Sequence, residues 1–360
     1  MEIFRAHYQW AQRPEDQRFT SLEAMRDQCL AYAAQAREAE LAWNTLRVEA
    51  VDKDLQLLGR TGVPAALSYY AFGQLAQRAG APAPYIRTLP PTLAAQNLNH
   101  GLAKRADAAT ARLLFHDRNG SGLLLRAATS TVYERIWNHE VLGRLVDLQG
   151  DGWQAATPDV VFAGLPHSAD PDLYASDHDM FAFIRHPDRA IDDGSEYGLR
   201  RGIIVSNSEV GDASLSATYF LYRYQCGNHI IWGAQDVLNV RVAHRGETAR
   251  ERFQSYLGTL TQYVDGSARE EEAQIAKART TVIAKDKAGV LDVLFGKRTL
   301  DLSRTQLEAG FDATVPDEDG DPCTVWGVVQ GLTRHSQTVA YADERTRLDR
   351  AAGKVLRITF

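Results

Sequence analysis

The sequence predicts an α+β fold, in which an antiparallel sheet of hairpins is interleaved with helices and the C-terminal region is helical. Candidate helices and strands follow one another in blocks, without the regular strand–helix alternation of a doubly wound parallel sheet. A clear hairpin signal covers residues 111–130, where two apolar runs flank a polar turn at 117–122. The 360 residues are 44% apolar and 24% charged, which is typical of a globular chain with one large or two intimate domains.

The first elements are a helix and a hairpin. Ser21 opens a helical stretch that is expected to reach about Trp43, because apolar residues recur there at three- and four-residue steps. Residues 46–51 and 55–58 flank a charged turn and predict a hairpin. Ser68 then caps a helix over 69–79, and Pro90-Pro91 begin another over 92–104.

Beyond the hairpin at 111–130, the pattern predicts a helix over 133–148 and then loops with a strand or two, one of them over 180–184. Further strands are expected over 203–205, 214–224 and 230–232. Charged helices follow over about 247–287, with a break near Gly266. An acidic loop at 312–322 leads into one long helix, expected over about 325–352.

These elements divide into three regions. An N-terminal helix and hairpin occupy 1–62, a mixed α/β core with the later signature strands occupies 63–245, and a mainly helical region over 246–360 is expected to pack on that core. The net charge of −6 argues against a uniformly basic surface. Only Cys29, Cys226 and Cys323 occur, without a paired spacing, so reduced thiols are expected. The sequence has no signal-peptide pattern and no long apolar window. We therefore expect the protein to lie in the cytoplasm of a bacterial host and not to contact a membrane.

Two segments resemble catalytic or metal motifs without satisfying them. Gly289 and Gly296-Lys297-Arg298 enclose six residues, whereas a phosphate loop needs four and a Ser or Thr after the lysine. Asp317, Asp319 and Asp321 alternate as in a calcium loop, but Pro322 and Val328 stand where an EF-hand needs Gly and Glu. The sequence thus identifies no catalytic residue and implies no cofactor, which favours a binding protein over an enzyme.

Asp177-His178-Asp179, with His186 beyond, is the densest group of metal-ligand residue types. Alternation along a strand would place Asp177 and Asp179 on one face, where two carboxylates can share a cation. No third ligand is placed by spacing, so the sequence favours a polar loop end that leads into the apolar run at 180–184, and no metal site is predicted.

Three separated segments carry a recognisable pattern. The first covers 75–99, the second 125–138, and the third, which is the most specific, comprises 205–211 and 222–228. Together they resemble the DUF932 family, a domain of unknown function typical of phages and plasmids. Members of that family are similar in setting to single-strand annealing proteins of the Rad52 type. The resemblance implies a role in DNA annealing or recombination, and a homo-oligomer.

The third segment contains a signature turn, which comprises Ser206, Asn207, Ser208, Glu209 and Gly211. Asn and Ser side chains satisfy local backbone groups in turns, Gly211 relaxes φ, and Glu209 is expected to accept from an arginine such as Arg201 or Arg223. Two interpretations stay open. The turn is either a sheet-edge turn around a buried ion pair, or a turn that presents Asn207 and Glu209 to a ligand.

Basic residues concentrate in the middle and later parts of the chain. Residues 241–304 hold 12 Lys or Arg against 9 Asp or Glu, whereas 305–323 hold six acids and no base. Because phosphates bind Arg and Lys and bases stack on flat side chains, this segregation predicts either a groove for nucleic acid or helix faces whose charges pair with each other. The candidate contacts are Arg126, Tyr133, Arg135, Arg200, Arg201, Tyr222, Arg223, Arg241, His244 and Arg245.

Three functions are therefore expected to compete. The leading one is a phage or prophage protein that binds single-stranded DNA as an annealing or recombination factor. The second is a protein-binding module, such as an inhibitor of a host defence factor, that uses the acidic loop with Asp317, Glu318 and Asp319. The third is a metal-dependent nuclease built around Asp177, Asp179 and Glu209.

Overall fold

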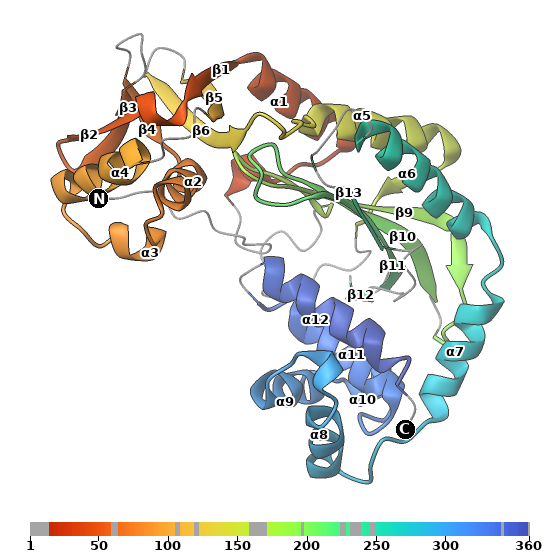
Figure 1. The fold of residues 1–360 in the computed structure, drawn as a ribbon. Coiled ribbons are helices and arrows are strands. Elements are labelled where there is room, and N and C mark those ends of the chain that lie inside the picture. The colour runs from red at the N-terminus through yellow and green to blue at the C-terminus, as the bar shows by residue number, and fades with distance from the viewer. Residues whose placement is uncertain are drawn as a thin grey trace.

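Two β-sheets and a C-terminal group of helices form the chain and confirm the predicted α+β class. In Figure 1 they follow an arch, with the first sheet at one end, the second sheet in the middle and the C-terminal helices at the other end. The computed structural model describes residues 14–58, 64–104, 109–118, 122–157, 171–195, 198–223, 228–230, 239–242, 244, 249–339 and 342–358.

The first sheet has six strands in the order β1-β5-β6-β4-β3-β2. Its neighbours are antiparallel except for β4 and β6, which run parallel. The predicted hairpins are confirmed, as β2 pairs with β3 and β5 with β6. Apolar side chains of the covering helices, such as Phe72 and Leu98, pack on Leu113 and Leu125 of the sheet. The bounds are β1 Ala36–Ala42, β2 Arg47–Val51, β3 Asp54–Leu58, β4 Pro64–Leu67, β5 Thr110–Asp117, β6 Leu123–Ser130, α2 Tyr69–Ala79, α3 Ala83–Ile86 and α4 Pro91–Lys104.

The helix expected from Ser21 to about Trp43 is about nine residues longer than the observed one. Helix α1 covers Leu22–Ala34, and Ala36–Ala42 form strand β1. Every residue of β1 has a partner on β5, from Ala36 opposite His116 to Ala42 opposite Thr110. The Ala- and Glu-rich segment favours a helix locally, but an edge position beside the central hairpin outweighs that preference.

The second sheet is antiparallel throughout, in the order β12-β11-β10-β9-β7, with β13 beside β11 and β8 beside β9. Strand alternation gives it two different faces. Ile203 and Val205 of β10 lie in the main buried core, whereas Ile204 and Ser206 lie half-buried on the other face. The bounds are β7 Gln154–Ala155, β8 Leu173–Ala175, β9 Met180–Ile191, β10 Leu199–Asn207, β11 Leu215–Arg223, β12 Asn228–Ile230 and β13 Asn239–Val242.

Helices α1, α5 and α6 cover the core face of the second sheet, on the outer side of the arch (Figure 1). Phe253, Leu257 and Leu260 of α6 follow one another at four- and three-residue steps, so they form one buried stripe. The predicted break near Gly266 is confirmed, since α6 ends and α7 begins around it. The bounds are α5 Asn138–Asp147, α6 Ala249–Asp265 and α7 Arg269–Thr280.

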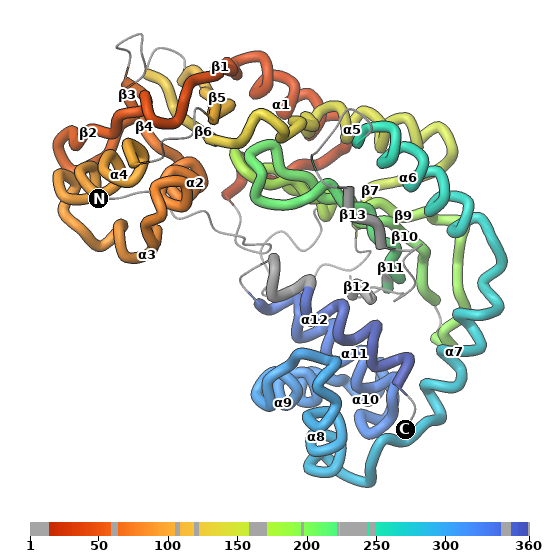
Figure 2. The backbone as a smooth tube through the Cα atoms, viewed as in Figure 1, coloured from red at the N-terminus to blue at the C-terminus, as the bar shows by residue number. Residues whose placement is uncertain are grey.

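Helices α8 to α12 follow α7 in the described part of the chain, and Figure 2 shows α12 beside the second sheet. The single helix expected over about 325–352 is two helices, α11 and α12. The break lets α12 fold back on α11, where Ser336 donates to Asp349 at 2.5 Å inside the core. The bounds are α8 Lys287–Phe295, α9 Arg304–Asp312, α10 Pro316–Asp319, α11 Val325–Ser336 and α12 Ala342–Val355.

The first sheet draws strands from both sides of the predicted boundary at 62/63, because β4 pairs with β3. Among the residues that the structure describes, no helix is both long enough and apolar enough to cross a membrane.

Candidate functional site

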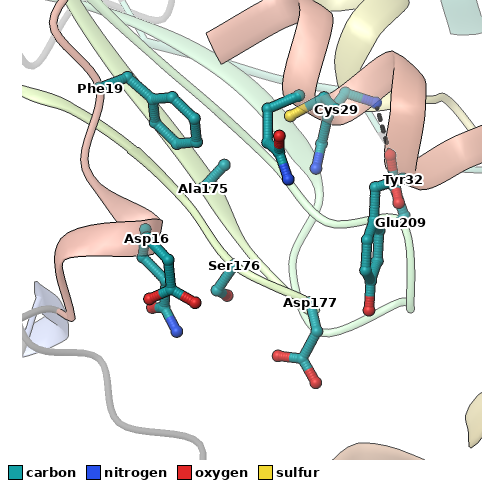
Figure 3. Close-up of a pocket in the computed structure, with 11 residues that line it drawn as sticks. Asp16, Phe19, Cys29, Tyr32, Ala175, Ser176, Asp177 and Glu209 are labelled. Carbon is teal, nitrogen blue, oxygen red and sulfur yellow. Dashed lines mark hydrogen bonds between the residues drawn. The ribbon is translucent and has the colours of Figure 1, made fainter. Parts of the chain in front are cut away.

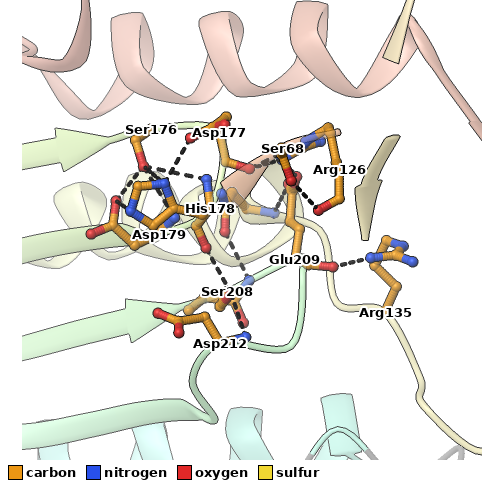
Figure 4. Close-up of polar contacts among 12 residues, drawn as sticks. Ser68, Arg126, Arg135, Ser176, Asp177, His178, Asp179, Ser208, Glu209 and Asp212 are labelled. Atoms are coloured by element: carbon orange, nitrogen blue, oxygen red, sulfur yellow. Dashed lines mark hydrogen bonds and ion pairs between the residues drawn. The ribbon is translucent and has the colours of Figure 1, made fainter. Parts of the chain in front are cut away.

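The signature turn joins β10 to β11 at the place where the two sheets meet (Figure 4). Gly211 adopts a φ of +84°, which glycine tolerates better than any other residue. The hydroxyl of Ser208 donates to the carbonyl of His178 at 2.6 Å. The amide of Asn207 donates to the carbonyl of Ile136 at 2.8 Å. The turn is thus held by its own side chains, and Asn207, at 1% exposure, is not presented to a ligand.

Glu209 is the centre of a buried polar network. One carboxylate oxygen accepts from the Arg126 guanidinium at 2.9 Å, and the other accepts from the backbone N–H of Asn138 at 2.9 Å. Asn138 is the first residue of α5, where a negative charge is favourable. The carbonyl of Glu209 accepts from Arg135, which also pairs with Glu38 at 2.7 Å. These contacts fit the sheet-edge turn around a buried ion pair.

The expectation that Glu209 pairs with Arg201 or Arg223 is wrong, because both arginines lie elsewhere. Arg201 pairs with Glu271 at 2.7 Å and donates to the last carbonyls of α6, including that of Val264 at 2.8 Å. Arg223 pairs with Asp319 and donates to the carbonyl of Glu318 at 2.8 Å.

Burial therefore changes the role of four of the predicted phosphate contacts. Arg126, Arg135, Arg201 and Arg223 are at most 5% exposed. Each pairs with a carboxylate of the same chain, so none of the four lines a solvent-facing groove. They hold sheets, helices and turns together instead.

The other predicted contacts differ in their surroundings. The Tyr133 hydroxyl donates to the carbonyl of Ser208 at 2.8 Å, and its ring stacks on His244 with 4.9 Å between centroids. Burial raises the pKa of Tyr133 above its usual range. Arg200 lies half-buried on β10 and donates to the carbonyl of Leu199. Arg245 and the side chains of Tyr222 and Arg241 lie outside the part of the chain that the structure describes.

His244 yields a prediction about pH. Burial lowers the pKa of its imidazole below the usual value, an effect that the carbonyl of Glu134 opposes and the charges of Arg135 and Arg250 reinforce. The unfolded chain then binds more protons than the folded one as the pH falls through the ordinary histidine range, so stability is lost. His244→Phe keeps a ring against Tyr133, and its melting temperature should fall less than that of the unchanged protein between about pH 8 and about pH 5.

The control for that measurement is His100→Phe, which replaces an exposed histidine on α4. It should leave the pH dependence of the melting temperature unchanged. Equal pH dependence in the His244→Phe variant and the unchanged protein would contradict the assignment.

The group Asp177-His178-Asp179 does not form the expected pair of carboxylates on one strand face. β9 begins only at Met180, and the two carboxylates lie on opposite sides of the buried His178 ring. Asp177 contacts Nδ1 at 2.7 Å and Asp179 lies 3.8 Å from Nε2. The pKa of Asp177 is lowered: burial opposes this, but the hydrogen bond from His178 and the charges of His178 and Arg126 outweigh it.

The nuclease hypothesis required Asp177, Asp179 and Glu209 to converge on a cation. Glu209 is engaged with Arg126, and Asp179 accepts from Ser176 at 2.5 Å. Within the described part of the chain, no group of three or more His, Cys, Asp or Glu side chains could hold a metal ion. Asp177 and Asp179 thus flank His178, whereas Glu209 is paired with Arg126.

The acidic segment at 312–322 is not a simple loop. Residues Pro316–Asp319 form helix α10, and Asp319, 1% exposed, pairs with Arg223 and with Arg334. Glu318 pairs with Arg334 at 2.7 Å, while Asp317 is exposed. Asp319 therefore belongs to the core, and only part of the predicted acidic surface is accessible to a partner.

A groove of about 670 Å³ lies between the second sheet and helix α12, and we call it the sheet–helix groove. On the sheet side, Phe181, Ser206 and Ser216 stand opposite one another on β9, β10 and β11. The hydroxyls of Ser206 and Ser216 lie 2.7 Å apart. The remaining lining residues are Ile204, Asp212, Ala213, Ser214, Thr218, Leu300, Asp301, Arg347, Arg350 and Lys354.

The helix side of the groove is basic. Arg347, Arg350 and Lys354 follow one another at three- and four-residue steps, so they share one face of α12. Arg347 donates to the carbonyl of Asp301 at 3.3 Å, and Lys354 to the carbonyl of Thr299 at 2.9 Å. The arrangement therefore combines cations, hydroxyls and one aromatic ring along a single hollow.

The α12 residues were absent from the predicted contacts. Their spacing was a usable signal, since basic side chains at three- and four-residue steps mark a helix face. Nothing local indicated that this face would meet the Ser206 side of a sheet more than 120 residues earlier in the chain.

Comparison with known proteins confirms the DUF932 family, and the first of the three segments, at 75–99, lies outside the matched residues. The family model described as "Domain of unknown function (DUF932)" matches residues 127–355. No curated protein and no solved structure matches the chain.

Proposed function

The chain belongs to the DUF932 family, whose function is unknown, and we propose from its own side chains that it binds single-stranded DNA in the sheet–helix groove. The observation that carries the proposal is the basic face of α12, formed by Arg347, Arg350 and Lys354, opposite the hydroxyl-bearing sheet face. Arginine and lysine neutralise phosphates, and serine and threonine hydroxyls donate to phosphate oxygens.

A single strand fits this groove better than a duplex. Phe181 lies on the sheet face beside the hydroxyls, and an aromatic ring on a sheet gives an unpaired base a surface for stacking. Asp212 and Asp301 lie at the groove and offset part of its positive charge. Binding is therefore expected to be moderate and to depend strongly on salt.

The resemblance to annealing proteins suggests the finer part of the proposal. In the bacterial host cytoplasm, a homo-oligomer of this chain would hold phage or plasmid single strands and pair complementary ones. Annealing of two complementary oligonucleotides, faster with the protein than without it, tests this part separately from binding.

Binding itself is tested by the fluorescence anisotropy of a labelled oligothymidylate of about 20 nucleotides. If three phosphates are neutralised, a plot of the logarithm of the affinity against the logarithm of the salt concentration should have a slope of about −2. The affinity then drops about 20-fold between about 50 and about 200 mM salt. Arg347→Gln/Lys354→Gln should flatten that slope by about 1.4, because two contacts are lost.

The matched control is Arg269→Gln/Lys285→Gln, which removes the same charge from exposed positions that do not line the groove. It should bind like the unchanged protein. Absence of binding at low salt, or equal affinities for the two double variants, would remove the proposal.

A further inference from the structure

A second pocket, of about 480 Å³, lies where the end of α12 meets α7, and we call it the α7–α12 pocket. Helix α7 contributes Lys277, and the turn that follows α12 contributes Arg357. The side-chain amide of Gln274 donates to the carbonyl of Leu356 at 3.0 Å and joins the two segments directly. Among the described residues, none lines both this pocket and the sheet–helix groove.

The α7–α12 pocket holds two cations that lack a counterion. Within the part of the chain that the structure describes, neither the Lys277 ammonium nor the Arg357 guanidinium takes part in an ion pair or a side-chain hydrogen bond. Both side chains are exposed, and no aspartate or glutamate is among the described lining residues. The four buried arginines of the candidate contacts differ, because each is paired with a carboxylate. Lys277 and Arg357 therefore keep their full charge for an anion from outside the chain.

Carbonyl groups at the two helix ends, which would repel an anion, already have donors. The Thr281 hydroxyl donates to the carbonyl of Lys277 at 2.8 Å, and Gln274 donates to that of Leu356. The backbone N–H of Arg357 donates to the carbonyl of Lys354 at 3.0 Å. These bonds satisfy acceptors that a helix C-terminus otherwise leaves open, so the cations dominate the charge of the pocket.

Another pocket, of about 220 Å³ and beside helix α1, has the opposite character (Figure 3). The carboxylates of Asp16, Asp177 and Glu209 line it, and no lysine or arginine does so among the residues that the structure describes. A phosphate would be repelled there and attracted to the α7–α12 pocket.

The basic face of α12 leads from the groove to this pocket. Arg347, Arg350 and Lys354 line the groove, and Arg347 and Lys354 lie about 10 Å apart along the helix axis. Arg357 follows Lys354 by a further three residues, and its N–H bond to the Lys354 carbonyl holds it next to the last cation of the groove. Phosphates that follow α12 along the groove therefore meet Arg357 and Lys277 next.

We propose that the α7–α12 pocket binds the next phosphates of the single strand that lies in the sheet–helix groove, so that the whole site contacts five phosphates. This inference rests on the proposed function, because it extends the path of the same strand. Lys277 and Arg357 neutralise the additional phosphates from opposite sides of the pocket. A duplex, which is stiff over about 150 base pairs, resists bending around the end of a helix, whereas a single strand follows this path.

The test compares two labelled oligothymidylates by fluorescence anisotropy of the full chain at several salt concentrations. Tetrathymidylate has three phosphates between its nucleosides, so it fills the groove alone and its salt slope should be about −2. An oligothymidylate of about 20 nucleotides reaches the pocket as well, and five contacts should give a slope of about −3.5. A slope of about −2 for both lengths would overturn the extension and leave binding in the groove intact. Absence of binding at either length would remove the proposed function and the extension together.

Lys277→Gln/Arg357→Gln should flatten the slope of the longer oligonucleotide by about 1.4 and leave that of tetrathymidylate unchanged, because only the longer strand reaches the pocket. The matched control is again Arg269→Gln/Lys285→Gln, whose positions are exposed and line neither the groove nor the pocket. Both double variants should keep the melting temperature of the unchanged protein, since all four side chains are exposed. Equal slopes in the two double variants, or the same loss at both oligonucleotide lengths, would contradict the assignment of the pocket.

Discussion

Glu209→Ala is expected to lower the free energy of unfolding by about 3–5 kcal/mol, because it leaves a charged guanidinium unpaired inside the protein. Arg126 is 1% exposed and Glu209 is 3% exposed, so water cannot replace the lost partner. The backbone N–H of Asn138 loses its acceptor as well. Chemical denaturation followed by circular dichroism measures the change.

Two further variants make this measurement decisive. Asp292→Ala breaks an ion pair with Arg304 whose side chains are more than half exposed, and should cost at most about 1 kcal/mol. Arg126→Met/Glu209→Leu removes both buried charges and should recover at least about 1 kcal/mol relative to Glu209→Ala. If Glu209→Ala lowers the free energy of unfolding no more than Asp292→Ala does, the buried pair does not stabilise the fold as assigned.

Gly331→Ala should destabilise the C-terminal helices by about 3 kcal/mol, at the upper end of overpacking effects. A Cβ at Gly331 would lie 2.1 Å from the carbonyl oxygen of Gly310 and 2.3 Å from Oγ1 of Thr314. The first of these is backbone and cannot rotate away, so α9 and α11 must separate. Gly327, one turn earlier on α11, makes a similarly close approach to the carbonyl of Asp321.

The matched control is Gly143→Ala in the interior of α5, where an added Cβ meets no atom within 4 Å. That change should stabilise the protein by about 0.5–1 kcal/mol, because alanine favours a helix more than glycine does. The same substitution thus has opposite signs at the two sites. A loss of stability at both, or at neither, would count against the close helix contact.

Local patterns predicted the elements that local chemistry determines. The caps at Ser21 and Ser68 accept from the third residue beyond them, and the hairpins at 46–58 and 111–130 formed as their alternation indicated. Strand β1 could not be predicted in this way, because its conformation depends on pairing with β5 about 75 residues later. The break between α11 and α12 likewise follows from tertiary packing, where Ser336 meets Asp349.

The sequence predicted the residues of the signature turn, but not which arginine pairs with which carboxylate. The residue types of the signature turn indicated that Glu209 accepts from an arginine, but the arginine is Arg126, 83 residues away. Arginines that look alike in sequence divide into core and surface only when the fold brings a carboxylate to some of them. The buried pair of Arg201 and Glu271 shows this, because the sequence around neither residue indicates that the two will meet.

The position of Arg126 on strand β6 has a consequence for modularity. Similarity to other proteins extends from residue 127 to 355, yet β6 covers Leu123–Ser130, so that boundary cuts through the strand. A fragment trimmed to the shared segment would lose Arg126, half of β6 and all of its neighbouring strands β4 and β5. The segment that matches the family is therefore shorter than the sheet to which its first strand belongs, and we expect a fragment of residues 127–355 to be less stable than the full chain.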